Sequence, residues 1–92
     1  MPSTKKVPIG NKGLSPDTVV RHTQTLGALV SAQRKRLALT QLDLAGLANT
    51  GNRFIVDVEN GKPTVQLQKV LELLELLGLE LVLRPKAAVG KS

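Results

Sequence analysis

The stretch that decides the fold is TQLDLAGLANTGNRFIVDVENGK, residues 40–62. Thr40 and Asp43 stand three residues apart, a variant of the capping box, and predict the start of a helix over 41–48. Asn49 then interrupts the pattern, because it tolerates the left-handed backbone that a tight turn between helices needs. The stretch therefore predicts a short helix, a tight turn and a second short helix.

The second helix is expected over 52–60, ended by Gly61. Ala45 is small, as it must be where two helices cross closely, while Ile55 and Val58 are suited to anchor the second helix against the first. These features match a helix-turn-helix frame, in which the opposite face of the second helix is free to enter a DNA major groove. The frame has its first, fifth, ninth, fifteenth and eighteenth positions at Gln41, Ala45, Asn49, Ile55 and Val58. The alternative is an ordinary helical hairpin packed in a bundle.

Outward from this frame, the chain predicts an all-α fold with one short strand. A helix over 24–37, with Thr23 as its N-cap, precedes the frame, and a helix over 65–77, capped by Thr64, follows it. The expected domain organisation is a flexible basic arm over 1–14, a helix-turn-helix domain over 15–78, a strand over 79–84 and a flexible tail over 85–92. Residues 15–22 are compatible with helix, strand or coil.

Composition narrows the classes of function. The 92 residues include no Cys, one His and one aromatic residue, which leaves no disulfide framework, no zinc ligand set and no stacking platform for single-stranded nucleic acid. The sequence lacks a membrane span and a signal-peptide pattern, so we expect a cytoplasmic protein without cofactor or metal. The net charge is +6, yet residues 37–83 carry three Lys/Arg against six Asp/Glu. Basicity gathers in the two ends and in the Arg34-Lys35-Arg36 cluster, which favours an anionic partner.

Residues 26–81 resemble the XRE/Cro-type helix-turn-helix of HipB-like antitoxins, over about 60% of the chain. The most specific segments are LALTQ (37–41), RFIVDVENGKPT (53–64) and LELLGLELVLR (74–84). The sequence departs from the common pattern at Asn49-Thr50, where many members have Gly-Val or Gly-Ile, and we expect a slightly looser turn there.

The resemblance implies a homodimeric repressor of its own operon that binds double-stranded operator DNA and holds a HipA-like serine/threonine kinase toxin inactive. Carried over by position, Gly51, Asn52, Arg53 and Val56 face bases; Gln41 and the Gly51 amide hold phosphates; Arg34, Arg36 and Lys62 add charge along the backbone. The alternatives are a solvated surface arginine for Arg53 and an N-cap role for Asn52.

The helix over 65–77 carries more apolar surface than one core needs. One predicted core stripe contains Leu67, Val70, Leu71, Leu74 and Leu77. A lone strand cannot satisfy its own backbone groups, so we expect it to pair with the same strand of a second subunit, which would set two recognition helices about 34 Å apart. The alternative is internal pairing with Val19-Val20. The predicted dimer interface is Leu73, Leu76, Leu79, Leu81 and Leu83.

A protein partner has two candidate surfaces, and the chain has no catalytic constellation. Leu42 and Leu47 lie on a helix face that is usually polar, and the acidic face of the helix over 65–77 is a second candidate. His22 and the serines lack a nucleophile context, and GKPT (61–64) lacks the P-loop spacing. We therefore expect no enzyme activity. Two other readings are a stand-alone XRE-type regulator and an interaction module that inhibits an enzyme partner.

Overall fold

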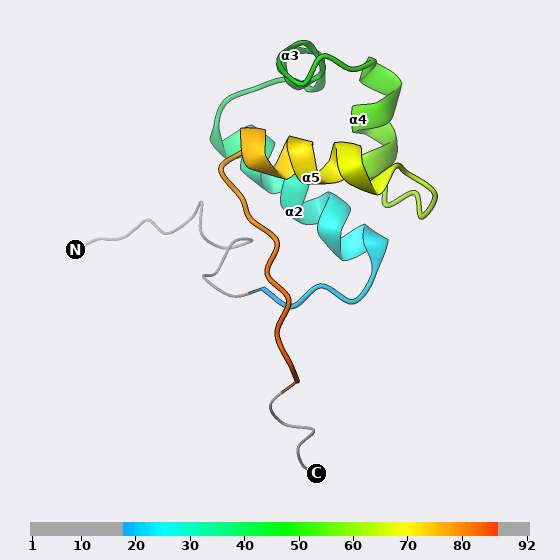
Figure 1. Cartoon of the computed structure of the whole chain (residues 1–92). Helices are drawn as coiled ribbons and strands as arrows, with labels where there is room; N and C mark the ends of the chain where they lie inside the picture. Colours follow the sequence, from blue (N-terminus) through cyan, green and yellow to red (C-terminus); the bar gives the residue numbers. More distant parts are fainter. Residues whose placement is uncertain (1–17, 87–92) are drawn as a thin grey trace, which may run out of the picture.

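The computed structural model describes residues 18–86, which form four helices and no strand. Figure 1 shows α5 lying across α2, with α3 and α4 at one side of that pair. The helices are α2 (Thr23–Arg36), α3 (Gln41–Leu47), α4 (Asn52–Glu59) and α5 (Leu67–Leu76). The all-α prediction is confirmed for these residues. The predicted arm over 1–14 and the end of the predicted tail, 87–92, lie outside the described residues.

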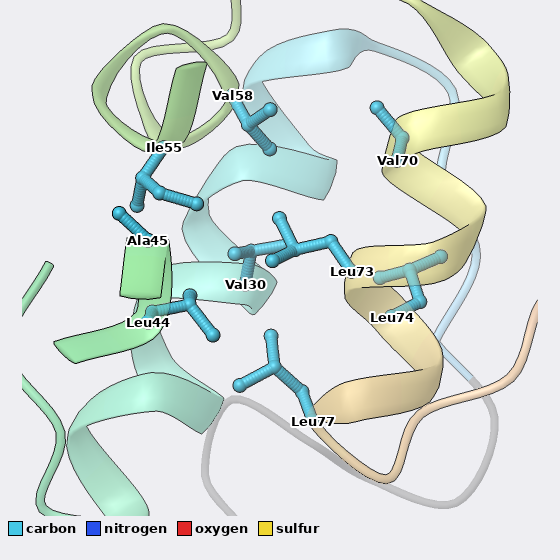
Figure 2. Close-up of a cluster of buried hydrophobic side chains, with 9 residues drawn as sticks. All are labelled: Val30, Leu44, Ala45, Ile55, Val58, Val70, Leu73, Leu74 and Leu77. Atoms are coloured by element: carbon cyan, nitrogen blue, oxygen red, sulfur yellow. The ribbon is translucent and has the colours of Figure 1, made fainter. Parts of the chain in front are cut away.

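The core is a single cluster to which all four helices contribute (Figure 2). Its largest fully buried side chains come from each helix or its cap: Val30, Leu44, Ile55, Leu73 and Leu77. Burying an aliphatic side chain of this size contributes about 1.5–3 kcal/mol, so the cluster is the main source of stability. The complete cluster is Val30, Leu44, Ala45, Ile55, Val58, Val70, Leu73, Leu74 and Leu77.

The buried face of α5 differs from the predicted stripe. Leu67 and Leu71 are exposed, whereas Leu73 is completely buried. The side-chain amide of Gln33 in α2 donates a 2.8 Å hydrogen bond to the carbonyl of Leu77, the C-cap of α5, and so joins the two helices. The buried residues follow regular helical spacing at positions 70, 73, 74 and 77. The observed stripe shares Val70, Leu74 and Leu77 with the predicted one and contains Leu73 in place of Leu67 and Leu71.

Two predicted N-caps are wrong. Thr23 is the first residue of α2 rather than its cap, and its hydroxyl donates to the carbonyl of Gly61 at 2.6 Å. Thr64 is not the N-cap of α5, because α5 starts at Leu67 and its N-cap is Gln66. By contrast, the capping box at the start of α3 is confirmed.

The helices share one way of ending. After each helix a residue with positive φ reverses the chain, and the next backbone N–H bonds back to a carbonyl of the last turn, as in a Schellman motif. Gly61 and Gly78 serve after α4 and α5, and Asn49 (φ 55°) after α3, as predicted. After α2 the position is held by Ala38 (φ 59°), which the sequence did not indicate.

The predicted strand over 79–84 does not form within the described chain, where residues 79–86 lack regular secondary structure. A strand needs a neighbouring edge for its backbone groups, and residues 18–86 contain no other strand. Val19 and Val20 are likewise not in a strand, so the internal pairing considered above is absent from the described residues.

Candidate nucleic-acid interface

Helix α4 has one face turned to the core and one turned to solvent. Ile55 and Val58 are buried, as the helix-turn-helix frame requires. On the other side the Arg53 side chain is 81% exposed, while Val56 is half-buried. Gly51 occupies the N-cap position with extended backbone, so Asn52 is the first residue of α4 and exposed. The N-cap alternative for Asn52 is therefore excluded. Of the four residues predicted to face bases, Gly51, Asn52 and Arg53 are exposed at the beginning of this helix, and the half-buried Val56 lies one turn later.

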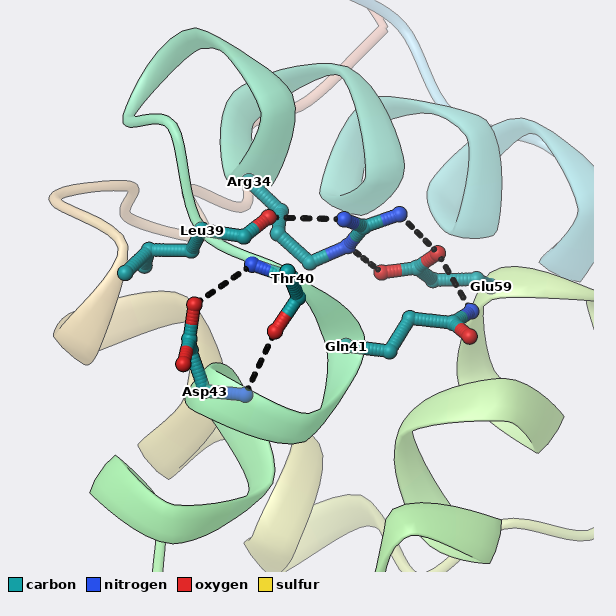
Figure 3. A network of polar contacts seen from close by, with 6 residues as sticks. All are labelled: Arg34, Leu39, Thr40, Gln41, Asp43 and Glu59. Atoms are coloured by element: carbon teal, nitrogen blue, oxygen red, sulfur yellow. Dashed lines mark hydrogen bonds and ion pairs between the residues drawn. The ribbon is translucent and has the colours of Figure 1, made fainter.

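A buried polar network holds the opposite, inner side of α4 (Figure 3). Arg34 of α2 makes a bidentate ion pair with Glu59, with Nε 2.6 Å from Oε2 and Nη2 3.0 Å from Oε1. Its Nη1 donates to the carbonyl of Leu39 at 2.8 Å. Gln41 Nε2 donates to Glu59 Oε1 at 3.0 Å. The side chains of Arg34 and Glu59 are only 10% and 6% exposed.

This network corrects the prediction for Arg34. Its guanidinium is committed to Glu59 and Leu39 inside the protein, so it is not a surface cation beside DNA. Gln41 is partly drawn into the same network, which joins the end of α2, the start of α3 and the end of α4. Sequence reasoning missed Glu59. The sequence did contain a signal for it, since α4 ends in a carboxylate and α2 ends in three cations. A cation that is buried needs an opposite charge beside it.

A second contact between α2 and α4 depends on glycine. A Cβ on Gly27 would collide with the carbonyl oxygen of Val58 and would lie 2.6 Å from that of Glu59. The α2 backbone therefore approaches the end of α4 more closely than any side chain allows. On the facing side, Gly61 has a φ of +80°, and a Cβ there would lie only 2.7 Å from the Cα of Gln24. Together with the Thr23–Gly61 hydrogen bond, these contacts fix where α4 ends.

The start of α3 is fixed by reciprocal hydrogen bonds between Thr40 and Asp43. The Asp43 N–H donates to the Thr40 hydroxyl at 3.0 Å, and the Thr40 N–H donates to Asp43 Oδ2 at 2.9 Å. The Thr40 backbone N–H, followed by its hydroxyl, holds the pKa of Asp43 below its ordinary value of 3.8. The box sets the entry of the chain into the helix-turn-helix and lies beside the buried network in Figure 3.

Helix α5 adds a cation beside the beginning of α4 that sequence reasoning did not single out. Lys69 Nζ lies 5.4 Å from the centroid of the Phe54 ring and 3.5 Å from the Thr50 hydroxyl. A lysine near an aromatic face is weakly attracted to it. Lys69 therefore places a positive charge beside Thr50 and Phe54, at the beginning of α4.

The remaining predicted DNA-contacting cations lie on the surface. Arg36 is exposed at the end of α2, and its Nε donates to Gln33 Oε1 at 3.2 Å. Lys62 is exposed just after α4, with Nζ 3.5 Å from Asp57 Oδ2. Arg53 Nε lies 3.7 Å from Asp57 Oδ1. The exposed side of α4 thus carries two cations that share one carboxylate.

The predicted dimer residues divide into two groups. Leu73 is in the core, and Leu79 packs against that core. Leu73 is therefore not available to a dimer interface, which corrects the prediction for this residue. Leu76, Leu81 and Leu83 are exposed. Elsewhere, Leu42 and Leu47 are exposed on α3 and, with Leu39, Asp43 and Gly46, line a shallow pocket.

Comparison with known proteins agrees with this geometry. The sequence model of a helix-turn-helix family, HTH_3, matches residues 30–83. The chain is also 57% identical over 53 residues to y4mF of Sinorhizobium fredii, named as an uncharacterized HTH-type transcriptional regulator; the match covers 58% of this chain and 70% of that protein. None of the helices described in residues 18–86 is both long and apolar enough to cross a membrane.

Proposed function

Because the chain belongs to the helix-turn-helix family, we propose that it is a sequence-specific repressor that reads operator DNA with the exposed face of α4. One observation supports the proposal: the inner side of α4 is held by buried contacts, and its outer side is exposed. Asn52 can pair with the N6/N7 edge of adenine, Arg53 with O6/N7 of guanine, and Val56 can contact a thymine methyl group. Asn52 and Arg53 begin the helix, where a recognition helix contacts bases, and Val56 lies one turn later.

Positioning contacts to the DNA backbone come from groups around this face. Arg36 and Lys62 are exposed cations on either side of the helix-turn-helix, and the Gly51 amide and Gln41 stand at the starts of α4 and α3. Such contacts set the register of a protein on the duplex without reading sequence. Arg34 takes no part, since its charge is used inside the protein.

The proposed repressor is a homodimer. Leu76, Leu81 and Leu83 leave an apolar surface on α5 and the following segment, and Leu83 is 89% exposed. A second copy covering this surface, with the two 79–84 segments paired as strands, would give the two segments a shared backbone ladder. A two-fold axis there requires a palindromic operator with half-sites one turn of DNA apart.

We further propose that the repressor is the antitoxin of a HipA-like kinase. The proposal rests on the resemblance of residues 26–81 to HipB-like antitoxins and on the exposed Leu42 and Leu47 of α3, a surface that a protein partner could cover. A stand-alone regulator accounts equally well for the DNA-reading face. An interaction module that inhibits an enzyme and contacts DNA only incidentally is the remaining alternative.

The primary test is a gel-shift titration of the full chain with DNA from upstream of its own gene and with a scrambled duplex of the same length and composition. We expect a preference for the upstream DNA and a steep loss of affinity as salt rises. Equal binding of both duplexes up to micromolar protein would reject the repressor function.

The antitoxin role has a separate test. A kinase-like reading frame next to this gene, whose product co-purifies with the chain and loses activity in the complex, would support it. Leu42→Ser/Leu47→Ser should weaken that complex and leave DNA binding unchanged. A chain that discriminates DNA but has no kinase neighbour would be the stand-alone regulator.

A further inference from the structure

The carboxylate of Asp57 lies on the exposed side of α4, between the two cations assigned to DNA contact. Its Oδ1 lies 3.7 Å from Arg53 Nε and its Oδ2 3.5 Å from Lys62 Nζ. The Asp57 side chain is 21% exposed, much less than that of Arg53. A negative charge at this place is unexpected, because the phosphates of DNA repel it wherever the helix approaches a duplex.

Stability does not explain this carboxylate. An exposed ion pair four residues apart on a helix adds little to folding, and the placement of α4 is already fixed by Glu59 and Gly27 on its inner side. What Asp57 does change is the freedom of Arg53. With Oδ1 3.7 Å from Nε, its charge attracts the guanidinium along α4 and leaves both terminal nitrogens for a partner.

We propose that Asp57 is a specificity-determining residue of the DNA-reading face. It positions Arg53 toward a base edge and keeps the Arg53 guanidinium from pairing freely with phosphates on DNA of any sequence. Specificity is a difference between two affinities, and a charge that penalises the wrong sequence raises it as effectively as a contact that favours the right one. The inference rests on the proposed DNA-reading function of α4.

The experiment compares the full-length wild type with Asp57→Asn by gel shift on upstream and scrambled duplexes at several salt concentrations. We expect Asp57→Asn to bind scrambled DNA more tightly, with little change on upstream DNA, so that the affinity ratio falls about fivefold or more. Glu75→Gln is the matched control: it makes the same charge change on exposed α5 and should keep the wild-type ratio. Asp57→Glu, which retains the charge, should preserve most of the discrimination.

A second set of variants shows whether Asp57 acts through Arg53. In an Arg53→Ala background, Asp57→Asn should no longer lower the ratio. Asp57→Ala is measured in parallel, and circular dichroism melts identify variants that fold. The inference is overturned by an unchanged ratio in a folded variant, by an equal gain on both duplexes, or by a fall that persists without Arg53. A wild type that does not discriminate would overturn the proposed function and this inference with it; a discriminating wild type with any of these outcomes overturns the inference alone.

Discussion

Helix α4 carries an acidic residue on each side, and the two carboxylates are paired in opposite ways. On the inner side, Glu59 receives both arms of Arg34 at 2.6 and 3.0 Å with almost no exposure to solvent. On the outer side, Asp57 receives Arg53 and Lys62 at 3.7 and 3.5 Å, and both cations remain mostly exposed. The inner pair has no freedom to meet a ligand, whereas the outer cations can exchange Asp57 for DNA. The same residue types therefore place α4 on its inner side and, in the proposed function, contact DNA on its outer side.

The largest loss of stability is expected when Arg34, the cation on the inner side of α4, is removed. Arg34→Ala leaves Glu59 buried and unpaired, and should lower the free energy of unfolding by about 3–5 kcal/mol, measured by urea denaturation. Replacing both partners, as Arg34→Met/Glu59→Leu, should recover a large part of the loss because no buried charge is then left alone. A loss under about 1 kcal/mol for the single variant would mean that the pair behaves like a surface one.

The contact between α2 and the inner side of α4 should also lose stability when a side chain is added to Gly27. Gly27→Ala places a Cβ against the carbonyls of Val58 and Glu59 and should cost about 1–3 kcal/mol, read from the shift of the denaturation midpoint. Gly46→Ala is the control, because a Cβ there meets no atom within 4 Å in the described chain. That exposed helical change should be neutral or stabilise by up to about 1 kcal/mol. Equal losses for the two variants would argue against a close approach at Gly27.

Substitutions on the outer side of α4 should affect DNA binding and leave the stability of the fold almost unchanged. Arg53→Ala should change the free energy of unfolding by less than about 0.5 kcal/mol while removing about 1–3 kcal/mol of discrimination at one base pair. Binding to a panel of single-site operator variants measures the second quantity. A uniform loss of affinity on every sequence would assign Arg53 to a phosphate instead of a base.

Ala38, which has a left-handed backbone after α2, should give a smaller change in stability, and this change is a gain. Ala38→Gly relieves an alanine at φ 59° and should stabilise the fold by about 0.5–1 kcal/mol. Ala28→Gly, at an exposed position inside α2, should destabilise it by about the same amount. Thermal unfolding of both variants checks the signs, and two losses would contradict the proposed strain.

The smallest effect concerns pH. Because the folded-state pKa of Asp43 is lowered, its capping hydrogen bonds contribute stability that is present above its ordinary value of 3.8 and is lost as pH falls through the lowered value. The difference in unfolding free energy between wild type and Asp43→Ala should therefore shrink on acidification below pH 4. A constant difference across this range would show that Asp43 acts through something other than its charge.

The frame of α3 and α4 was predictable because its determinants are local. Thr40 and Asp43 cap each other, and Asn49 and Gly61 each mark a turn within a few residues. The contacts that sequence reasoning missed join distant segments: Arg34 to Glu59, Gly27 to Val58 and Lys69 to Phe54. Local patterns could not decide which of three adjacent cations turns inward, nor whether Leu71 or Leu73 faces α2. The exposed residues of α4 were identified because burial of Ile55 and Val58 dictates which side remains outside.

Glu59 is the last residue of α4, and Arg53 lies six residues before it. At 1.5 Å of rise per residue, the two are separated by about 9 Å along the axis, so the Arg34–Glu59 ion pair holds α4 at the end away from Arg53. A tilt of about 6° at the anchored end would move the reading end by about 1 Å over that length, enough to misalign a bidentate hydrogen bond. For the proposed DNA-reading α4, substitutions around Glu59 should therefore change which operators are bound, even though Glu59 is buried on the side of the helix away from DNA.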